Sequence, residues 1–496
     1  MTLSRSTDFA PGWNGLARTP PMGWRSWNAF HTDISQNNIL QAGEALIARN
    51  RTIAGHPGKV SLCDLGYCSV GVDEGWEDCT AGAPPSRQHD QAGLPTIDPK
   101  FPDMAGMVQK LQDLGLSAGW YLNGCKCGEH VELEKNYEGD IRSLSKFGFD
   151  VHELCRRLSL APYAKMLRNT SCALLPQSVK IDGCGQQRNM THYAELMKAT
   201  GKSYHIENCH WGHCTNSDNS SCPTKDWCPF NWYRTSGDIN TGSMSWFDNL
   251  QTARRFLDWQ EPLSVPGCWA YPDMLEVGNV VEPSEGTWAV WNRAHFGAWC
   301  IISAPLILGL VLSDDRLETV LDFIGNKEAI AVNQAWAGHP GLLVDEIEDQ
   351  ERGNRPHTQN TGDQLVGANT ELGGRNTSVE RLVRQTPTST SAVLSQRVRY
   401  ESTGGRIMAR GLSGQLWAKP QPGGGAAILL INTSPKSLAY FLALSKVNLT
   451  APSYAVRDIW ARRSHEASPV TTAIALSVAP YDSAFLLFTP IVVLER

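Results

Sequence analysis

The segment Ser178–Gly185 (SVKIDGCG) joins a short strand-forming run to an aspartate and a glycine-rich turn. Its pattern predicts a buried strand that delivers Asp182 to the turn. A carboxylate at the end of an apolar strand must be paired, hydrogen-bonded or functional, because its desolvation is unfavourable. Lys180 is expected on the same side of the strand, where its charge would favour the ionised Asp182 that a nucleophile requires. The alternative interpretation is that Asp182 caps the next helix.

The same arrangement, a short apolar run that ends in polar or Gly-rich residues, recurs along the first two thirds of the chain. The other seven runs are Met22–Phe30, Cys68–Trp76, Ser117–Cys125, Ser203–Trp211, Trp232–Asp238, Gly267–Leu275 and Pro305–Leu310. Stretches with apolar residues at helical spacing, such as Asp103–Leu116, lie between them. Eight strands that alternate with helices predict an α/β fold, a (β/α)8 TIM barrel. Such a barrel has its active site at the C-terminal ends of the strands, where the polar and aromatic residues of these runs gather.

The character of the chain changes after Gln334, where polar stretches separate short alternating runs. These runs are Gln415–Ala418, Gly425–Asn432, Ser453–Trp460 and Ser483–Pro490. They predict a C-terminal antiparallel β-sandwich domain. We therefore expect an N-terminal extension at 1–14, a catalytic barrel at 15–337 and the sandwich at 338–496. The segment 151–178 interrupts the alternation of predicted strands and helices and is interpreted as a surface loop or a retained intron.

Composition limits the partners and the compartment of the protein. The net charge of −6 and the pI near 6.1 argue against nucleic acid or a membrane surface as the partner. The longest uncharged run, Phe296–Leu312, is broken by Pro305 and is short for a membrane span.

All fourteen cysteines lie between Cys63 and Cys300. Asn-x-Ser/Thr sequons occur at Asn50, Asn169, Asn189, Asn219, Asn376, Asn432 and Asn448. Cysteines and sequons together favour a secreted or lysosomal/vacuolar protein, although residues 1–13 contain no apolar run typical of a signal peptide.

A second carboxylate, Asp238, ends the run that contains Arg234. Two aspartates at the ends of different barrel strands can face each other across a substrate, as the nucleophile and the acid/base of a glycoside hydrolase do. Further carboxylates, Asp73-Glu74 and Asp273, follow two other strands and could accept hydrogen bonds from sugar hydroxyls.

Aromatic residues at the strand ends could provide flat faces for a sugar ring. The candidates are Trp27, Trp76, Tyr121, Trp211 and Trp269. For Trp76 and Trp269, packing in the core is the favoured interpretation.

Several of these runs together resemble glycoside hydrolase family 27, the retaining α-galactosidases and α-N-acetylgalactosaminidases. The motifs are GLARTPPMGWRSWN, LGYCSVGVDEGW, DPKFPDMAGMVQKLQDLGLSAGWYLN, VKIDGCG, YRTSGDI and PDMLEVGN. The resemblance extends from about Gly15 to Gln334, and the tail resembles the β-domain of that family more loosely. It implies that Asp182 is the nucleophile and Asp238 the acid/base. Lys180 and Arg234 are then expected to keep Asp182 ionised, and the pKa of Asp238 is expected to be raised, because this group must be protonated in the first step.

The resemblance also implies a set of residues that contact the sugar. They are Trp27, Asp73, Tyr121, Lys180, Arg234 and Asp273, with Glu74, Cys209, His210 and Trp211 at the variable edge of the pocket. Cys184 corresponds to a cysteine that is disulfide-bonded to the loop after the third strand, with Cys127 or Cys125 as its partner here. A terminal galactosyl oligosaccharide or glycoconjugate is the implied substrate, with no cofactor, no metal and a homodimer as the candidate assembly.

Two departures from the family pattern bear on specificity. Most α-galactosidases carry Asp-Asp where this chain has Asp73-Glu74, and the longer Glu74 would extend toward the galactose hydroxymethyl. A similar change is found in relatives that act on β-L-arabinopyranosides, which lack that group. The sequence Cys209-His210-Trp211-Gly212 carries His where relatives usually have Glu, and its bulk argues against a pocket for an N-acetyl group.

Two other interpretations compete with the glycosidase. Cys209, His210, His213 and Cys214, with Cys222 and Cys228, could form a zinc cluster, but their spacing is not a standard one. A catalytically inactive sugar-binding relative would keep the aromatics and the hydroxyl-reading carboxylates. Such a protein would need neither Asp182 nor Asp238, so the presence of both favours an enzyme.

Overall fold

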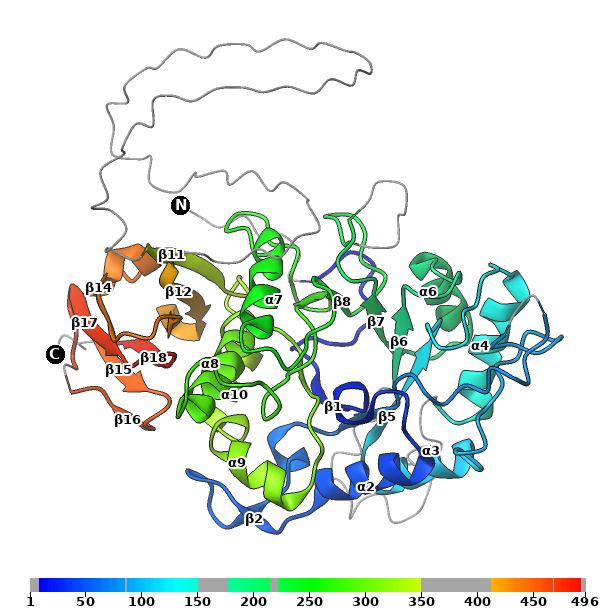
Figure 1. The fold of residues 1–496 in the computed structure, drawn as a ribbon. Helices are drawn as coiled ribbons and strands as arrows, with labels where there is room; N and C mark the ends of the chain where they lie inside the picture. The colour runs from blue at the N-terminus through cyan, green and yellow to red at the C-terminus, as the bar shows by residue number, and fades with distance from the viewer. Residues whose placement is uncertain are drawn as a thin grey trace, which may run out of the picture. The chain divides into compact units, whose positions relative to one another are not determined.

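A computed structural model describes residues 9–84, 87–149, 177–214, 222–348, 412–466 and 468–491 (Figure 1). Its first part is built on eight strands: β1 (Met22–Arg25), β4 (Ser69–Gly71), β5 (Ser117–Leu122), β6 (Ser178–Asp182), β7 (His205–Cys209), β8 (Trp232–Arg234), β9 (Trp269–Tyr271) and β10 (Leu306–Leu308). They form one sheet in the order β10-β1-β4-β5-β6-β7-β8-β9, and all neighbours are parallel. A parallel bridge between Leu275 and Leu308 joins the two ends of the sheet, so the ring closes. The predicted barrel is confirmed, and each strand occupies the first part of its predicted run.

The helices follow the strands around the ring. They are α1 (Trp27–Phe30), α2 (Gln36–Ile47), α3 (Met104–Asp113), α4 (Glu134–Lys146), α6 (Met190–Ala199), α7 (Ser245–Ala253), α8 (Trp288–Ile301), α9 (Asp314–Ile324) and α10 (Lys327–Gln334). Helix α3 illustrates why the sequence folds in this way. The Asp103 side chain caps its first turn by accepting from the Gly106 N–H, and apolar residues at helical spacing bury one face against the sheet. These residues are Met104, Met107, Val108 and Leu111.

Short elements complete the first part of the chain. A small hairpin pairs β2 (Arg51–Thr52) with β3 (Lys59–Val60), and 3₁₀ turns cover Cys63–Leu65 and Arg254–Phe256. No helix within the described residues is long and apolar enough to cross a membrane. The segment 150–176, which contains most of the interruption seen in the sequence, lies outside the described residues.

The C-terminal part forms two antiparallel sheets. One has the order β11 (Leu342–Glu348), β12 (Leu412–Gln421), β13 (Gly425–Asn432), β18 (Ser483–Pro490), β15 (Tyr454–Asp458) and β16 (Arg463–Ser464). The other pairs β14 (Leu438–Ala443) with β17 (Ala473–Val478), and 3₁₀ turns cover Pro422–Gly424 and Leu444–Val447. Alternate residues of both sheets form a second apolar core, which includes Leu430, Leu442 and Leu476. The predicted β-sandwich is confirmed, while the limits of the domains stay a prediction.

Candidate active site

The residues that carry the expected chemistry all lie at the C-terminal ends of barrel strands. Asp182 is the last residue of β6 and Cys209 is the last residue of β7. Asp73 and Asp273 follow β4 and β9 by two residues, and Asp238 follows β8 by four. Because the strands are parallel and adjacent in one ring, their ends meet at one face of the barrel.

Asp182 is buried, with 6% of its surface exposed, and is held by three donors. The Tyr121 hydroxyl donates to Oδ2 over 3.0 Å, the Cys184 N–H donates to Oδ1 over 3.2 Å, and the Cys209 thiol lies 3.8 Å from Oδ2. The Asn123 side chain donates to the main-chain carbonyl of Asp182 over 2.6 Å. These contacts fix both the carboxylate and the turn that carries it.

Asp238 differs from Asp182 in exposure and in its partner. Its side chain is 55% exposed, and the Arg234 guanidinium donates to Oδ1 over 2.8 Å. The same guanidinium lies 3.0 Å from Asp273, and Trp211 also hydrogen-bonds to Asp238. Asp273 is fixed in turn by the main-chain N–H groups of Ile239 and Met274.

The Cys209 thiol connects the two aspartates. Its sulfur accepts from Arg234 Nη1 over 3.4 Å and contacts Asp182 on its other side. Asp182 and Asp238 are therefore separated by one thiol and one guanidinium, on the same face of the barrel. Two carboxylates at one face of a barrel are a feature of the two-carboxylate mechanism.

Three residues around these carboxylates adopt positive φ although they are not glycine. They are Asn123 (59°), Trp211 (52°) and Asp273 (84°). Such backbone strain tends to collect at functional sites, where the surrounding contacts hold it in place. Here it aims two of the side chains at Asp182 and Asp238 through the bonds described above.

Asp73 and Lys180 form the buried ion pair at the base of the site. Lys180 Nζ donates to Asp73 Oδ2 over 2.8 Å, and the Glu74 N–H donates to Oδ1. The Lys180 ammonium also lies 5.0 Å from the centre of the Tyr121 ring, which bonds to Asp182. Lys180 is therefore paired with Asp73 and lies near the tyrosine that binds Asp182.

The acidities of the two aspartates are opposite to the sequence expectation, which had Asp182 kept ionised by Lys180 and Asp238 with a raised pKa. Desolvation raises the pKa of Asp182 to about 6 against the charge of Lys180, which is paired with Asp73. Burial also acts on Asp238, but the charge and hydrogen bond of Arg234 hold the pKa of Asp238 below its ordinary value. The expectation was wrong because the sequence does not show which carboxylate each cation binds.

The remaining predicted residues differ in how they pack. Trp76 and Trp269 are buried, and their indole N–H groups donate to the Tyr121 and Ala17 carbonyls, as expected for core residues. His210 and Trp211 lie against Gly183, where an added Cβ would be 3.2 Å from each ring. Trp27 is partly buried and packs edge-on against His31.

Comparison with known proteins agrees with this arrangement. Residues 19–335 match the family described as alpha galactosidase A, and residues 413–488 match the alpha galactosidase C-terminal beta sandwich domain. The chain belongs to the alpha galactosidase A family. The resemblance to glycoside hydrolase family 27, and with it the glycoside hydrolase class, is confirmed.

Relatives in this family include α-galactosidase 3 from Arabidopsis thaliana, which is 28% identical over 67% of this chain and 64% of its own length. The α-galactosidase of Oryza sativa is 27% identical over 67% of each chain. The chain thus spans about two thirds of these curated relatives. Among solved structures, Saccharomyces cerevisiae α-galactosidase aligns with a TM-score of 0.64 at 17% identity over 97% of this chain and all of that one. A β-L-arabinopyranosidase from Geobacillus stearothermophilus aligns with a TM-score of 0.61 at 15% identity, over 97% and 98%. These two structures share the fold.

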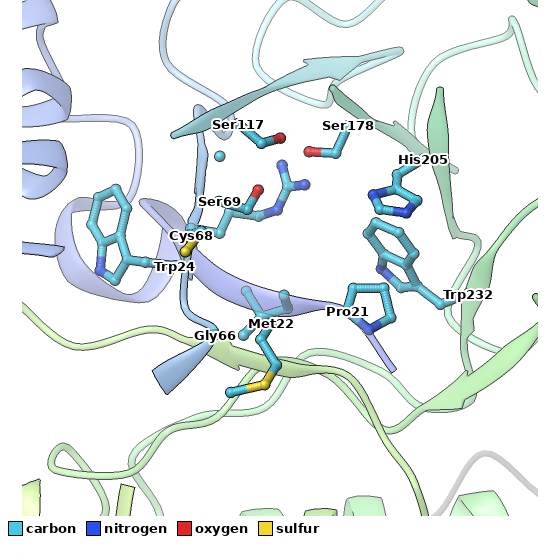
Figure 2. Close-up of a pocket in the computed structure, with 13 residues that line it drawn as sticks. Pro21, Met22, Trp24, Gly66, Cys68, Ser69, Ser117, Ser178, His205 and Trp232 are labelled. Atoms are coloured by element: carbon cyan, nitrogen blue, oxygen red, sulfur yellow. The ribbon is translucent and has the colours of Figure 1, made fainter. Parts of the chain in front are cut away.

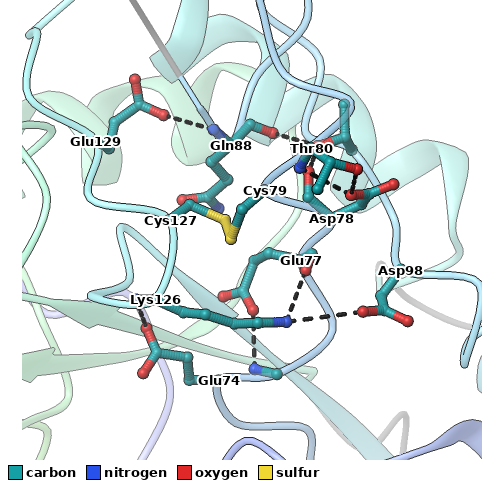
Figure 3. The surroundings of a disulfide bond; sticks show 12 residues. Glu74, Glu77, Asp78, Cys79, Thr80, Gln88, Asp98, Lys126, Cys127 and Glu129 are labelled. Carbon is teal, nitrogen blue, oxygen red and sulfur yellow. Dashed lines mark hydrogen bonds and ion pairs between the residues drawn. A yellow bond between two sulfur atoms is a disulfide. The ribbon is translucent and has the colours of Figure 1, made fainter.

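The disulfides differ from one pairing in the sequence prediction. Of the two partners expected for Cys184, Cys125 is the one bonded to it, and Cys127 was wrong. Cys127 is bonded to Cys79 (Figure 3). The described residues form three further bridges: Cys63–Cys68, Cys214–Cys222 and Cys228–Cys268. The bridges at Cys214 and Cys228 leave Cys209 as the one free thiol among the four cysteines of the alternative zinc cluster. Cys125 and Cys184 lie close to Asp182, but their bond likewise leaves no thiolate for a metal.

The loop that carries Cys125 and Cys127 also anchors Glu74. The Lys126 N–H donates to Glu74 Oε1 over 2.5 Å, and Lys126 Nζ donates to the Glu77 carbonyl over 2.8 Å (Figure 3). An added Cβ at Gly124 would lie 2.7 Å from the same Glu74 oxygen, so the loop backbone packs directly on this carboxylate. Glu74 is buried and cannot move away from the site without breaking these contacts.

A buried histidine stabilises this loop. His89 Nδ1 lies 3.1 Å from Glu129 and Nε2 lies 3.0 Å from Asp140, which also accepts from Tyr193. Burial alone would lower the pKa of His89, but the two carboxylates raise it to about 9.

Replacing His89 with glutamine is expected to lower the free energy of unfolding by about 3 kcal/mol at pH 6, the equivalent of raising a pKa from 6.5 to about 9. The folded-state pKa lies above the unfolded one, so this stabilisation is complete below pH 6.5 and is lost as the pH rises to about 9. Urea unfolding at pH 6 and pH 9 measures it, with His192→Gln, at an exposed ion pair, as the control. An equal loss at both pH values would contradict the charged His89.

A separate cavity of about 110 Å³ lies at the opposite end of the barrel (Figure 2). It is lined by residues that begin the strands, among them Met22, Ser117, Ser178, His205 and Trp232. Neither Asp182 nor Asp238 lines it. The cavity also contacts Arg25, which belongs to a charged pair that the sequence analysis did not include.

Proposed function

We propose that this chain is a retaining exo-glycosidase that removes terminal α-D-galactosyl residues from oligosaccharides or glycoconjugates. The placement of Asp182 and Asp238 on either side of the Cys209 thiol carries the proposal. Family membership and the names of the curated relatives support galactose as the sugar. A Saccharomyces cerevisiae α-galactosidase of the same fold has been solved with raffinose, which supports an oligosaccharide substrate class.

The chemistry proceeds in two displacements. Asp182 attacks the anomeric carbon while Asp238 transfers its proton to the glycosidic oxygen, so the bond to the aglycone breaks as the bond to Asp182 forms. Asp238, now ionised, removes a proton from water, which attacks the same carbon and releases Asp182. Two inversions leave the α configuration unchanged.

The surrounding residues divide the supporting roles. The Tyr121 hydroxyl orients Asp182, and we assign Asp73, Asp273 and Lys180, which are buried and paired in this structure, to the sugar hydroxyls. Arg234 stabilises the ionised Asp238 that the second step uses. Because Asp238 is half exposed, a bound aglycone would displace water from it and raise the pKa of this group toward the value that the first step needs.

Glu74 supports a second candidate activity, on β-L-arabinopyranosides. Its carboxylate is tied to the Cys125–Lys126 loop and cannot retreat to make room for a hydroxymethyl group. A pyranose without that group would fit beside it. A β-L-arabinopyranosidase shares the fold of this chain.

Hydrolysis of p-nitrophenyl α-D-galactoside and p-nitrophenyl β-L-arabinopyranoside should be compared directly. We expect galactoside activity in the unmodified protein and a rise of about tenfold in galactoside kcat/KM in Glu74→Asp, because one methylene is worth 1–3 kcal/mol in a pocket. Glu318→Asp, on exposed α9, is the control. An initial preference for the arabinoside that Glu74→Asp reverses would establish the second activity. No turnover of either substrate would indicate an inactive sugar-binding relative.

We further propose a secreted or vacuolar location, since disulfides persist in oxidising compartments. The five bridges support this proposal. A glycan at Asn432 is not expected, because its side chain is buried and donates to three carbonyls.

A further inference from the structure

A buried ion pair crosses the interior of the barrel beneath the proposed active site. Arg25 ends β1 and Glu207 lies in β7, and three strands separate β1 from β7 in either direction around the ring. Arg25 Nη2 and Glu207 Oε2 are 3.1 Å apart, and the two side chains are 4% and 3% exposed. Removing one partner of such a pair is destabilising, because it leaves an uncompensated charge in the core.

Arg25 also contacts the sugar-binding end of the site. Its Nη1 lies 3.7 Å from Asp73 Oδ2 and donates to the Val72 carbonyl. Asp73 Oδ2 is the same oxygen that accepts from Lys180. Asp73 Oδ2 therefore lies near two cations, Lys180 and Arg25. Arg25 is also paired with Glu207 on the opposite side of the barrel.

The backbone leaves room for Arg25 at one particular position. An added Cβ at Gly71 would lie 3.0 Å from Arg25 Cζ and 3.2 Å from Nε. The guanidinium therefore packs directly on the β4 backbone, two residues before Asp73. Its position is fixed by this contact and by its two carboxylate partners.

We propose that the Arg25–Glu207 pair is a positioning device that sets how Lys180 is divided between Asp73 and Asp182. Arg25 neutralises part of the charge on Asp73, so the Lys180 ammonium is not fully engaged there. The remaining attraction acts on Asp182, which binds the Tyr121 hydroxyl while the ring of Tyr121 lies 5.0 Å from the Lys180 ammonium. Glu207 limits the effect of Arg25 on Asp73, because its carboxylate offsets part of the Arg25 charge. This inference rests on the proposed glycosidase function.

The direction of each charge effect follows from the groups that face Asp182 on every neighbouring strand. They are Lys180 on β6, Asp73 after β4, Tyr121 on β5, Cys209 on β7 and Arg234 on β8. Removing the positive charge of Arg25 from this cluster raises the pKa of its carboxylic acids, and removing the negative charge of Glu207 lowers it. The two single substitutions must therefore move the pH dependence of the reaction in opposite directions.

The pH optimum of kcat/KM for an aryl α-galactoside tests the pair, with Arg25→Gln, Glu207→Gln and the double variant. We expect a shift of about half a pH unit upward for Arg25→Gln and downward for Glu207→Gln, because each charge acts on Asp182 through Asp73 and Lys180 and not by direct contact. The double variant, whose net charge equals that of the wild type, should return to the original optimum. The Arg457–Glu328 ion pair, at 2.8 Å and remote from the site, provides matched control substitutions that leave the optimum unchanged.

A purely structural role predicts a different result. Arg25→Gln and Glu207→Gln would then lose stability and activity with the optimum unmoved, which would overturn the inference. If Arg25→Gln does not fold, the downward shift of Glu207→Gln alone decides the question. A wild-type protein without galactosidase turnover would overturn the proposed function as well, whereas an active one with unmoved optima overturns only the positioning role.

Discussion

Replacing Asp182 with asparagine should lower kcat for an α-galactoside by about 10⁴-fold or more, since a nucleophile that forms the covalent intermediate has no substitute. Asparagine has the same shape and can still accept from the Tyr121 hydroxyl. Binding of galactose should therefore change little. Single-turnover kinetics for the chemical step and calorimetry for galactose binding measure the two quantities separately.

Chemical rescue distinguishes a nucleophile from a residue that only supports the fold. In Asp182→Gly the removed carboxylate leaves space beside the Cys209 thiol and the Tyr121 hydroxyl. Azide should enter this space, attack the anomeric carbon and give a galactosyl azide of inverted configuration. Asp315→Asn, at the exposed N-terminus of α9, is the control and should keep full activity. Retention of activity in Asp182→Asn would remove the proposed nucleophile.

The barrel could be predicted because its signal is local and repeated. Each strand buries a short apolar run, and each run continues into polar residues at the same end, so the alternation reveals the ring without knowledge of contacts. Asp182 and Asp238 were found in the same way, as strand-end carboxylates. The antiparallel runs after β11 carry a similar local signal.

What the sequence could not show is the pairing of charges across the ring. Arg25 and Glu207 are far apart in the chain and meet only because β1 and β7 lie opposite each other. Whether Lys180 binds Asp73 or Asp182 depends on distances of a few ångströms, and this choice determines how far Lys180 offsets the effect of desolvation on the pKa of Asp182. The available signals for the buried pair were Arg25 and Glu207 themselves, each a charged residue inside an apolar strand run.

The disulfide error has a similar cause. Cys125 and Cys127 are two residues apart in a turn, so either sulfur could face Cys184 as far as the sequence shows. The loop directs Cys125 toward the turn after Asp182 and Cys127 toward Cys79 in the loop after β4. The path of this loop depends on tertiary contacts such as those of Lys126 with Glu74 and Glu77.

Substitution of Asp238 by alanine should give a result that depends on the leaving group. An acid/base residue assists the departure of a poor leaving group but not of an activated phenol. We expect kcat/KM to fall by about 10³-fold for an unactivated galactoside and by less than about tenfold for 2,4-dinitrophenyl galactoside, whose aglycone departs without a proton. The second displacement also loses its base, so the galactosyl-enzyme should accumulate and be detectable by mass spectrometry.

The pH profile gives the sharper test, because the two aspartates have separated acidities. Attack needs ionised Asp182, whose pKa is raised to about 6, and proton donation needs protonated Asp238, whose pKa is lowered by Arg234. In the wild-type enzyme kcat/KM should therefore be highest at acidic pH and fall above about pH 6, as the proton that the pair shares is lost. In Asp238→Ala with the activated substrate only Asp182 matters, so the rate should instead rise through pH 6 and remain high. A profile that still falls above pH 6 in this variant would show that Asp238 is not the group that donates the proton. Asp273 is the other carboxylate bound to Arg234, and it would then be the residue to substitute.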